Sequence, residues 1–143
     1  MAHLIHSVLP HPRRAIVYVE PQLSVESCIE LMVTQNIGAL VVLEDNKLKG
    51  MVTERDVVRE CIRNGFDPQK ATAGDIAYAD VSILQSNDQV EKAMETITIT
   101  RRRHVLVAED GELIAILSIG DLLLNLLDDK SRVIAHLEHY ITS

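Results

Sequence analysis

Hydrophobic and polar positions alternate along the chain in blocks of strand length and helix length. The apolar run Ile16 to Val19 predicts a strand, which Pro21 closes. Ser24 then suits a helix N-cap, because the apolar residues after it recur at helical spacing. Asn36-Ile37-Gly38 ends that helix. The apolar runs 39–43 and 48–53, separated by the polar turn 44–47, predict a β-hairpin.

A second helix is predicted at residues 56–63, with Asn64-Gly65 as its C-terminal signal. The resulting βαββα pattern recurs later in the chain at a constant offset of 65 positions. Thr96 to Thr100 resembles a strand by its β-branched alternation, yet it aligns with the end of the first helix. We therefore predict a helix there, since tertiary context overrides propensity.

An internal repeat too small to bury its own faces implies two units packed together. The fold class expected is mixed α/β (α+β), with two βαββα repeats about a pseudo-twofold axis and a C-terminal helix. The predicted parts are a lead-in at 1–15, a first repeat at 16–65, a linker at 66–80, a second repeat at 81–130 and the C-terminal helix at 131–143.

Composition narrows the function classes. Among 143 residues, 47% are hydrophobic but only 3% aromatic, so the core must be aliphatic. The net charge of -7 argues against nucleic-acid binding, which needs a broad basic face. Neither a signal peptide nor an apolar stretch of membrane-spanning length stands out, so we expect a cytoplasmic protein that does not enter a membrane.

The cysteine and histidine residues do not predict a catalytic or metal site. Cys28 and Cys61 suit free, buried or half-buried thiols, with a disulfide or a reactive thiol as the alternative. The histidines of the lead-in (His3, His6 and His11) lie among prolines and are read as part of a partly ordered surface segment, not as metal ligands. His136 and His139 lack a third ligand. Without a nucleophile motif or phosphate loop, the sequence favours a protein that is not an enzyme.

Both repeats present a hydroxyl and a carboxylate where a strand gives way to a helix. Thr53 and Asp56 occupy this place in the first repeat, and Ser118 and Asp121 in the second. Such a position is a natural site for a small polar ligand. The alternative is that each Asp only caps its helix, and recurrence does not separate the two readings because a cap would recur as well.

With these motifs in place, the chain resembles a tandem CBS-domain protein, a pair known as a Bateman module and here of the stand-alone bacterial type. The resemblance rests on the repeat, on Gly50 to Asp56 and on Ile116 to Asp121. It implies a cleft between the repeats that holds an adenine nucleotide such as AMP, ADP, ATP or NAD, or S-adenosylmethionine, with no cofactor required.

The resemblance also implies roles for individual residues. Asp56 and Asp121 would accept hydrogen bonds from ribose hydroxyls, and Thr53 and Ser118 would bond the ribose or phosphate. Adenine would be recognised by the first strand of each repeat, near the residues Ile16, Val17, Tyr18, Val81, Ser82 and Ile83.

The two repeats differ where the resemblance implies phosphate contact. The second repeat has the basic run Arg101, Arg102, Arg103 and His104, whereas the aligned first-repeat stretch is uncharged and ends in Gly38 and Ala39. The run is either a solvated edge or a phosphate site, and its place in the repeat favours the phosphate site. Gly38 and Ala39 would leave room for the ligand.

Some positions depart from the family pattern, and any of these departures would be consistent with only one of the two potential sites being used. Ala115 stands where the first repeat has Gly50, Val41 and Leu106 replace a proline common in the middle strand, and Ala77-Tyr78 replaces a Met-Thr or Met-Ser pair.

The function expected is a ligand-sensing regulatory module that forms a homodimer through its outer helices at 56–63 and 121–127. The alternative is an interaction module with empty clefts, which dimerises or docks to an unidentified protein.

Overall fold

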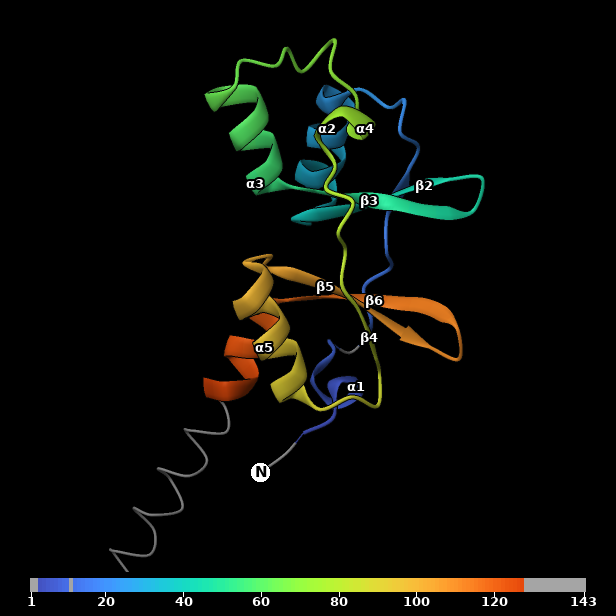
Figure 1. Ribbon diagram of the computed structural model, residues 1–143, viewed down its shortest axis with the longest axis vertical. Coiled ribbons are helices and arrows are strands. Elements are labelled where there is room, and N and C mark those ends of the chain that lie inside the picture. The colour runs from blue at the N-terminus through green and yellow to red at the C-terminus, as the bar shows by residue number, and fades with distance from the viewer. Residues whose placement is uncertain (1–2, 11, 128–143) are drawn as a thin grey trace, which may run out of the picture. The chain divides into compact units, whose positions relative to one another are not determined.

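A computed structural model describes residues 3–10 and 12–127 of the chain (Figure 1). A final helix covers residues 119–127 of this part, and the helix predicted at 131–143 lies outside the described residues. The preceding elements are α1 (Ile5–Val8), β1 (Tyr18–Val19), α2 (Val25–Gln35), β2 (Ala39–Glu44), β3 (Lys47–Thr53), α3 (Glu54–Val57), η1 (Val58–Arg63), α4 (Ala73–Ile76), β4 (Ile83–Gln85), α5 (Val90–Thr100), β5 (His104–Glu109) and β6 (Glu112–Ser118).

The chain divides into two compact units. Unit 1 joins the residues up to Arg14 with those from Ser82 onward, and unit 2 runs from Ala15 to Val81. Each unit contains a three-stranded sheet, ordered β1-β2-β3 in unit 2 and β4-β5-β6 in unit 1. The first strand pairs parallel to the middle strand, and the last two form an antiparallel hairpin. In Figure 1 the longer helices of a unit lie on the same side of its sheet. The predicted mixed α/β class is confirmed.

The repeat predicted from sequence holds in the backbone at the same offset. The hairpin of unit 2 has a bulge between Val42 and Leu43, and the hairpin of unit 1 has one between Val107 and Ala108. Both hairpins turn through two residues of positive φ, at Asp45-Asn46 (51° and 62°) and at 110–111 (52° and 81°). Such pairs are typical of type I′ turns, whose twist matches the flanking strands.

The first predicted helix is confirmed together with its caps. The Ser24 hydroxyl accepts a hydrogen bond from the backbone N–H of Ser27 at 3.1 Å, and Asn36 ends α2 in the left-handed conformation. The helix predicted over Thr96 to Thr100 is confirmed as well, as part of α5. The hydroxyls of Thr96 and Thr100 donate to carbonyls four residues earlier, each at 2.7 Å. These bonds satisfy the hydroxyls inside the helix.

The helix predicted at 56–63 differs in form. It begins at Glu54 as α3, and from Val58 it continues as the π-helix η1. The N–H of Asn64 bonds the carbonyl of Arg59 at 3.0 Å, five residues back. The first predicted strand is shorter than expected, since β1 holds only Tyr18 and Val19.

The lead-in is not the surface segment that the sequence suggested. Ile5 is fully buried and Leu9 is 3% exposed, both within the core of unit 1. The N–H groups of Ile5 and His6 donate to the carbonyls of Asp88 and Ser86, both at 2.9 Å. The prolines do end α1 early, but the residues before them complete the second repeat.

The predicted linker plays the equivalent part in unit 2. Ala73 donates to the Leu23 carbonyl at 2.7 Å and Gly74 to the Pro21 carbonyl at 2.9 Å. These two acceptors lie 65 positions before Asp88 and Ser86. Ala73 and Ile76 are buried in the core of unit 2. Each repeat is therefore completed by the segment that precedes the other repeat's first strand, and the chain passes between the units after Arg14 and after Val81.

Both cores are aliphatic, as the composition predicted. The unit 1 core contains Ile5, Leu9, Leu84, Val90, Ala93, Ile97, Val105, Val107, Ala115, Leu117 and Leu122. The unit 2 core contains Val19, Val25, Cys28, Met32, Leu40, Val42, Val52, Ala71, Ala73 and Ile76. Between residues 3 and 127, the described helices are all too short or too polar to span a bilayer.

Candidate functional site

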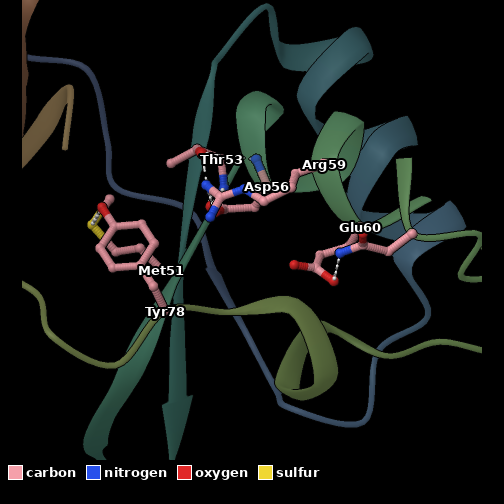
Figure 2. Close-up of polar contacts among 7 residues, drawn as sticks. Met51, Thr53, Asp56, Arg59, Glu60 and Tyr78 are labelled. Atoms are coloured by element: carbon pink, nitrogen blue, oxygen red, sulfur yellow. Dashed lines mark hydrogen bonds and ion pairs between the residues drawn. The ribbon is translucent and has the colours of Figure 1, made fainter. Parts of the chain in front are cut away.

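Thr53 and Asp56 of unit 2 form a reciprocal cap at the start of α3. The Oδ2 atom of Asp56 accepts bonds from the Thr53 N–H at 2.9 Å and the Thr53 hydroxyl at 2.7 Å. The Asp56 N–H donates to the Thr53 hydroxyl at 3.3 Å. Arg59 lies 3.5 Å from Oδ1, and Figure 2 shows Asp56 between Thr53 and Arg59. The Asp56 side chain is only 5% exposed, so both of its oxygens are engaged and shielded from solvent.

Ser118 and Asp121 form the matching cap in unit 1. The Ser118 N–H donates to Asp121 Oδ2 at 3.0 Å, and the Asp121 N–H donates to the Ser118 hydroxyl at 3.1 Å. The cation on this carboxylate comes from the lead-in, since Arg14 Nη2 lies 3.2 Å from Oδ1. The Asp121 side chain is 12% exposed, more than that of Asp56. Nothing in the sequence singled out Arg14, which stands 107 positions away.

The capping interpretation of both aspartates is confirmed, and ribose contact stays a prediction beside it. A third box of the same type occurs at Thr72 and Asp75, where the Thr72 N–H donates to Asp75 Oδ2 at 2.9 Å and the return bond is 3.3 Å. That box starts α4 (Ala73–Ile76), which contains none of the predicted site residues. The hydroxyl-x-x-Asp pattern alone therefore does not mark a ligand site.

Sheet pairing brings the basic run of unit 1 to the Ser118 cap. His104 begins β5 and pairs with Ser118 at the end of β6. The carbonyl of Arg103 accepts the N–H of Ile119 at 2.8 Å. The side chains of Arg101 and Arg103 are exposed, while those of Arg102 and His104 are half-buried. Four predicted site residues thus gather at one end of the unit 1 sheet: Arg103, His104, Ser118 and Asp121.

The uncharged counterpart in unit 2 has the same backbone arrangement. Ala39 pairs with Thr53, and the Gly38 carbonyl accepts the N–H of Glu54 at 3.1 Å. The first residue of each stretch is left-handed, with φ of 53° at Asn36 and 59° at Arg101. The two stretches therefore differ in charge while they share these backbone features.

The first strands lie on the opposite edge of each middle strand from these caps. The Val17 carbonyl accepts the N–H of Val41 at 3.0 Å, and the Ser82 carbonyl accepts the N–H of Leu106 at 2.9 Å. Ile83 pairs with Leu106, two residues along β5 from His104. The remaining predicted adenine-site residues are Ile16 and Val81, which are half-buried, and Tyr18, which is 43% exposed.

Comparison with known proteins identifies the architecture. The profile of the CBS domain family matches residues 6–63 and 73–128. The chain belongs to the CBS domain family. A mitochondrial CBS domain-containing protein, CBSX3 of Arabidopsis thaliana, is 30% identical over 82% of this chain and 60% of its own length. This chain therefore spans about 60% of that relative.

Solved CBS structures share the fold over most of the chain. The crystal structure of the CBS domain NE2398 matches with a TM-score of 0.81 and 32% identity, over 89% of this chain and 99% of that one. A hexameric CBS-CP12 protein from bloom-forming cyanobacteria matches with a TM-score of 0.77 at 22% identity, over 87% of this chain and 72% of that one, which shows the fold alone.

Three departures of this CBS pair from its family pattern have structural reasons. Val41 and Leu106 are fully buried, and their N–H groups hold the first strands, which a proline could not do. Tyr78 exchanges two backbone bonds with Met51, each at 3.0 Å, beside Gly50. A β-carbon on Gly50 would collide with the Tyr78 carbonyl oxygen. At the equivalent position, Ala115 is accommodated in the unit 1 core.

A cavity of about 440 Å³ lies beside Asp121 within unit 1 of the CBS pair. It is lined by Ser7, Val8, Pro10, Arg14, Asp121, Leu124 and Asn125. Its size falls within the range of small-molecule sites. A second cavity, of about 350 Å³ in unit 2, is lined by Tyr18, Val19, Glu20, Leu43, Asp45 and Asn46. Of the predicted site residues, these two cavities contain Asp121 and Tyr18.

The two cysteines are free thiols in this CBS pair, as expected. Burial raises the pKa of Cys28, and burial together with the nearby carboxylates Glu60 and Asp67 raises the pKa of Cys61. Raised pKa values keep both groups protonated and poorly nucleophilic at neutral pH. Across the residues that the structure describes, no three His, Cys, Asp or Glu side chains gather as metal ligands would.

Arg101 occupies a backbone conformation that costs stability. Its φ of 59° lies in the left-handed region, which a β-branched or long side chain adopts less readily than Gly or Asn. We expect Arg101→Gly to raise the free energy of unfolding by about 0.5–1 kcal/mol. Urea unfolding measures this change. A loss of stability would show that the Arg101 side chain makes contacts that outweigh the backbone strain.

Proposed function

We propose that this CBS pair is a non-catalytic regulatory module that binds an adenine nucleotide, and that unit 1 supplies the ribose and phosphate contacts. The observation that carries the proposal is the basic run at 101–104, which sheet pairing places beside the Ser118 cap. The equivalent stretch of unit 2 has the same backbone but no charge. The candidate ligands are AMP, ADP, ATP and NAD.

Ribose recognition falls to Asp121. A carboxylate offers about four lone-pair sites, and the bonds from Ser118 and Arg14 occupy two of them. The 2′ and 3′ hydroxyls of a ribose would take both lone-pair sites of Oδ1, one of which the exposed Arg14 side chain now occupies. Asp56 is a poorer candidate, because it already accepts two bonds from Thr53, contacts Arg59 and is 5% exposed.

Phosphate recognition falls to Arg103 and His104. Arginine donates in a planar fork that matches phosphate oxygens, and charge-assisted bonds of this kind are about twice as strong as neutral ones. The strained backbone at Arg101 supports a functional reason for the basic run, since Asn36 fills the same position in unit 2 at a lower conformational cost. Adenine would pack on the first strand, near Ser82 and Ile83.

A ligand panel tests this proposal. Thermal unfolding is followed with and without AMP, ADP, ATP, NAD and S-adenosylmethionine, each near millimolar concentration. A ligand that binds only the folded state stabilises it by about 2.7 kcal/mol at a hundredfold excess over Kd, so the midpoint rises visibly. An unchanged midpoint with every ligand, in protein shown free of bound nucleotide, would favour an interaction module that works without a ligand.

The regulatory output is a change in packing or partner affinity, because a ligand shifts an equilibrium only by binding two states differently. The outer helices support assembly into a homodimer. Along 119–127 the side chains of Leu123, Leu124, Leu126 and Leu127 are 50% to 65% exposed, and in η1 Ile62 is 80% exposed. Light scattering at micromolar concentration tests the dimer, and a monomer would remove this part of the proposal.

A further inference from the structure

The carboxylate proposed to hold the ribose already carries a cation from a distant part of the chain. Arg14 Nη2 lies 3.2 Å from Asp121 Oδ1, while the Ser118 N–H bonds Oδ2 at 3.0 Å. Arg14 and Asp121 also share the lining of the 440 Å³ cavity. The hydroxyl groups of a ribose that approach the Asp121 carboxylate from this cavity would therefore contact the Arg14 guanidinium.

The corresponding cation in unit 2 is held differently. Arg59 is on the same helical segment as Asp56, three residues later, so the fold of that helix fixes their contact. Arg14 instead lies in the stretch 12–17, which is outside any helix or strand, and its side chain is 61% exposed. The Arg14 pair can open without loss of helical hydrogen bonds, because the Ser118 cap does not depend on it.

We propose that Arg14 is a gate on Asp121, so that nucleotide binding must break the Arg14–Asp121 ion pair. This inference rests on the proposed nucleotide site and assigns it a regulatory contact. The chain passes from unit 1 to unit 2 directly after Arg14. Loss of this ion pair therefore frees the end of a segment that connects the two units. Nucleotide binding at unit 1 would in this way change the connection to unit 2.

The competition predicts that removal of Arg14 tightens nucleotide binding. Arg13 supplies a matched control, since Arg13→Ala removes the same charge from the neighbouring position. Arg13 pairs with Glu109 at 3.8 Å and does not take part in the Asp121 cap. Both variants should lose the same long-range attraction for phosphate. The ratio of their dissociation constants for the nucleotide therefore reports the effect of the Arg14–Asp121 ion pair alone.

The experiment is calorimetric titration of AMP into the wild type, Arg14→Ala and Arg13→Ala. We expect Arg14→Ala to bind AMP about two- to fivefold more tightly than Arg13→Ala, the range set by an exposed ion pair. Equal affinity, or weaker binding by Arg14→Ala, would overturn the gate while leaving the nucleotide site in place. If the wild type binds none of AMP, ADP, ATP and NAD, the proposed site fails, and the gate fails with it.

Discussion

Ile5→Ala is expected to destabilise unit 1 by about 2–5 kcal/mol, although Ile5 stands only five residues from the start of the chain. The side chain is fully buried among the strands and helices of the second repeat. Truncation to Ala removes apolar contacts and leaves a cavity that rigid neighbours fill only in part. Urea unfolding of the full chain measures the loss.

Leu4→Ala is the matched control, because Leu4 precedes Ile5 and is 37% exposed. We expect it to change stability by less than about 0.5 kcal/mol. Hydrogen exchange gives the location of the effect. Exchange in Ile5→Ala should accelerate at Val105 and Val107 of β5 and not at the equivalent Leu40 and Val42 of β2. Equal acceleration in both strands would contradict the assignment of the lead-in to unit 1.

Gly50→Ala is expected to cost about 1–3 kcal/mol in unit 2, in the range of overpacked cores. The added methyl group would meet the Tyr78 carbonyl oxygen, and the carbonyl carbon at 3.0 Å. Backbone atoms cannot move aside as a flexible side chain can. We therefore expect loss of the two 3.0 Å bonds between Met51 and Tyr78, which calorimetric unfolding and faster exchange of the Tyr78 amide would detect.

Gly120→Ala is the control for this substitution. Among the described residues, a methyl group there would meet the Ser118 hydroxyl oxygen at an ordinary 3.5 Å. Because Gly120 lies in the helix at 119–127, alanine should stabilise it by about 0.5–1 kcal/mol. If Gly50→Ala proved as stable as the wild type, the close approach of Tyr78 would not constrain position 50.

The sequence predicted the repeat, its register and the caps because these depend on local patterns. The constant offset of the repeat correctly predicted a helix at Thr96 to Thr100, although the residue types there favour a strand. Asn36 and Gly111 occupy positions of positive φ that their residue types favour. Chain order predicted the hairpins, since the strands that pair there are adjacent in sequence.

The sequence pattern did not predict that each repeat is completed by a segment that precedes the other repeat. The lead-in lacks sequence similarity to residues 71–78, yet His3 and Ala71 each accept a backbone bond from the first residue of a helix, Val90 and Val25. Hydrogen bonds between backbone groups do not require particular side chains, so they leave no recognisable pattern in the sequence. The Arg14–Asp121 ion pair could not be predicted for a related reason. The two residues are 107 positions apart, and no repeating pattern in the sequence connects them.

The most direct test of the nucleotide site is calorimetric titration of AMP into the wild type, Arg103→Ala and Arg63→Ala. Both arginines are exposed, but Arg63 belongs to η1 of unit 2. A bond to a charged group contributes about 1.5–3 kcal/mol, so Arg103→Ala should weaken AMP binding at least about tenfold. Arg63→Ala should bind within about twofold of the wild type, since Arg63 is not part of the basic run and its exposed charge is screened by salt. Equal AMP affinity in all three proteins, or no binding of AMP, ADP, ATP or NAD by the wild type, would contradict an adenine-nucleotide site on unit 1.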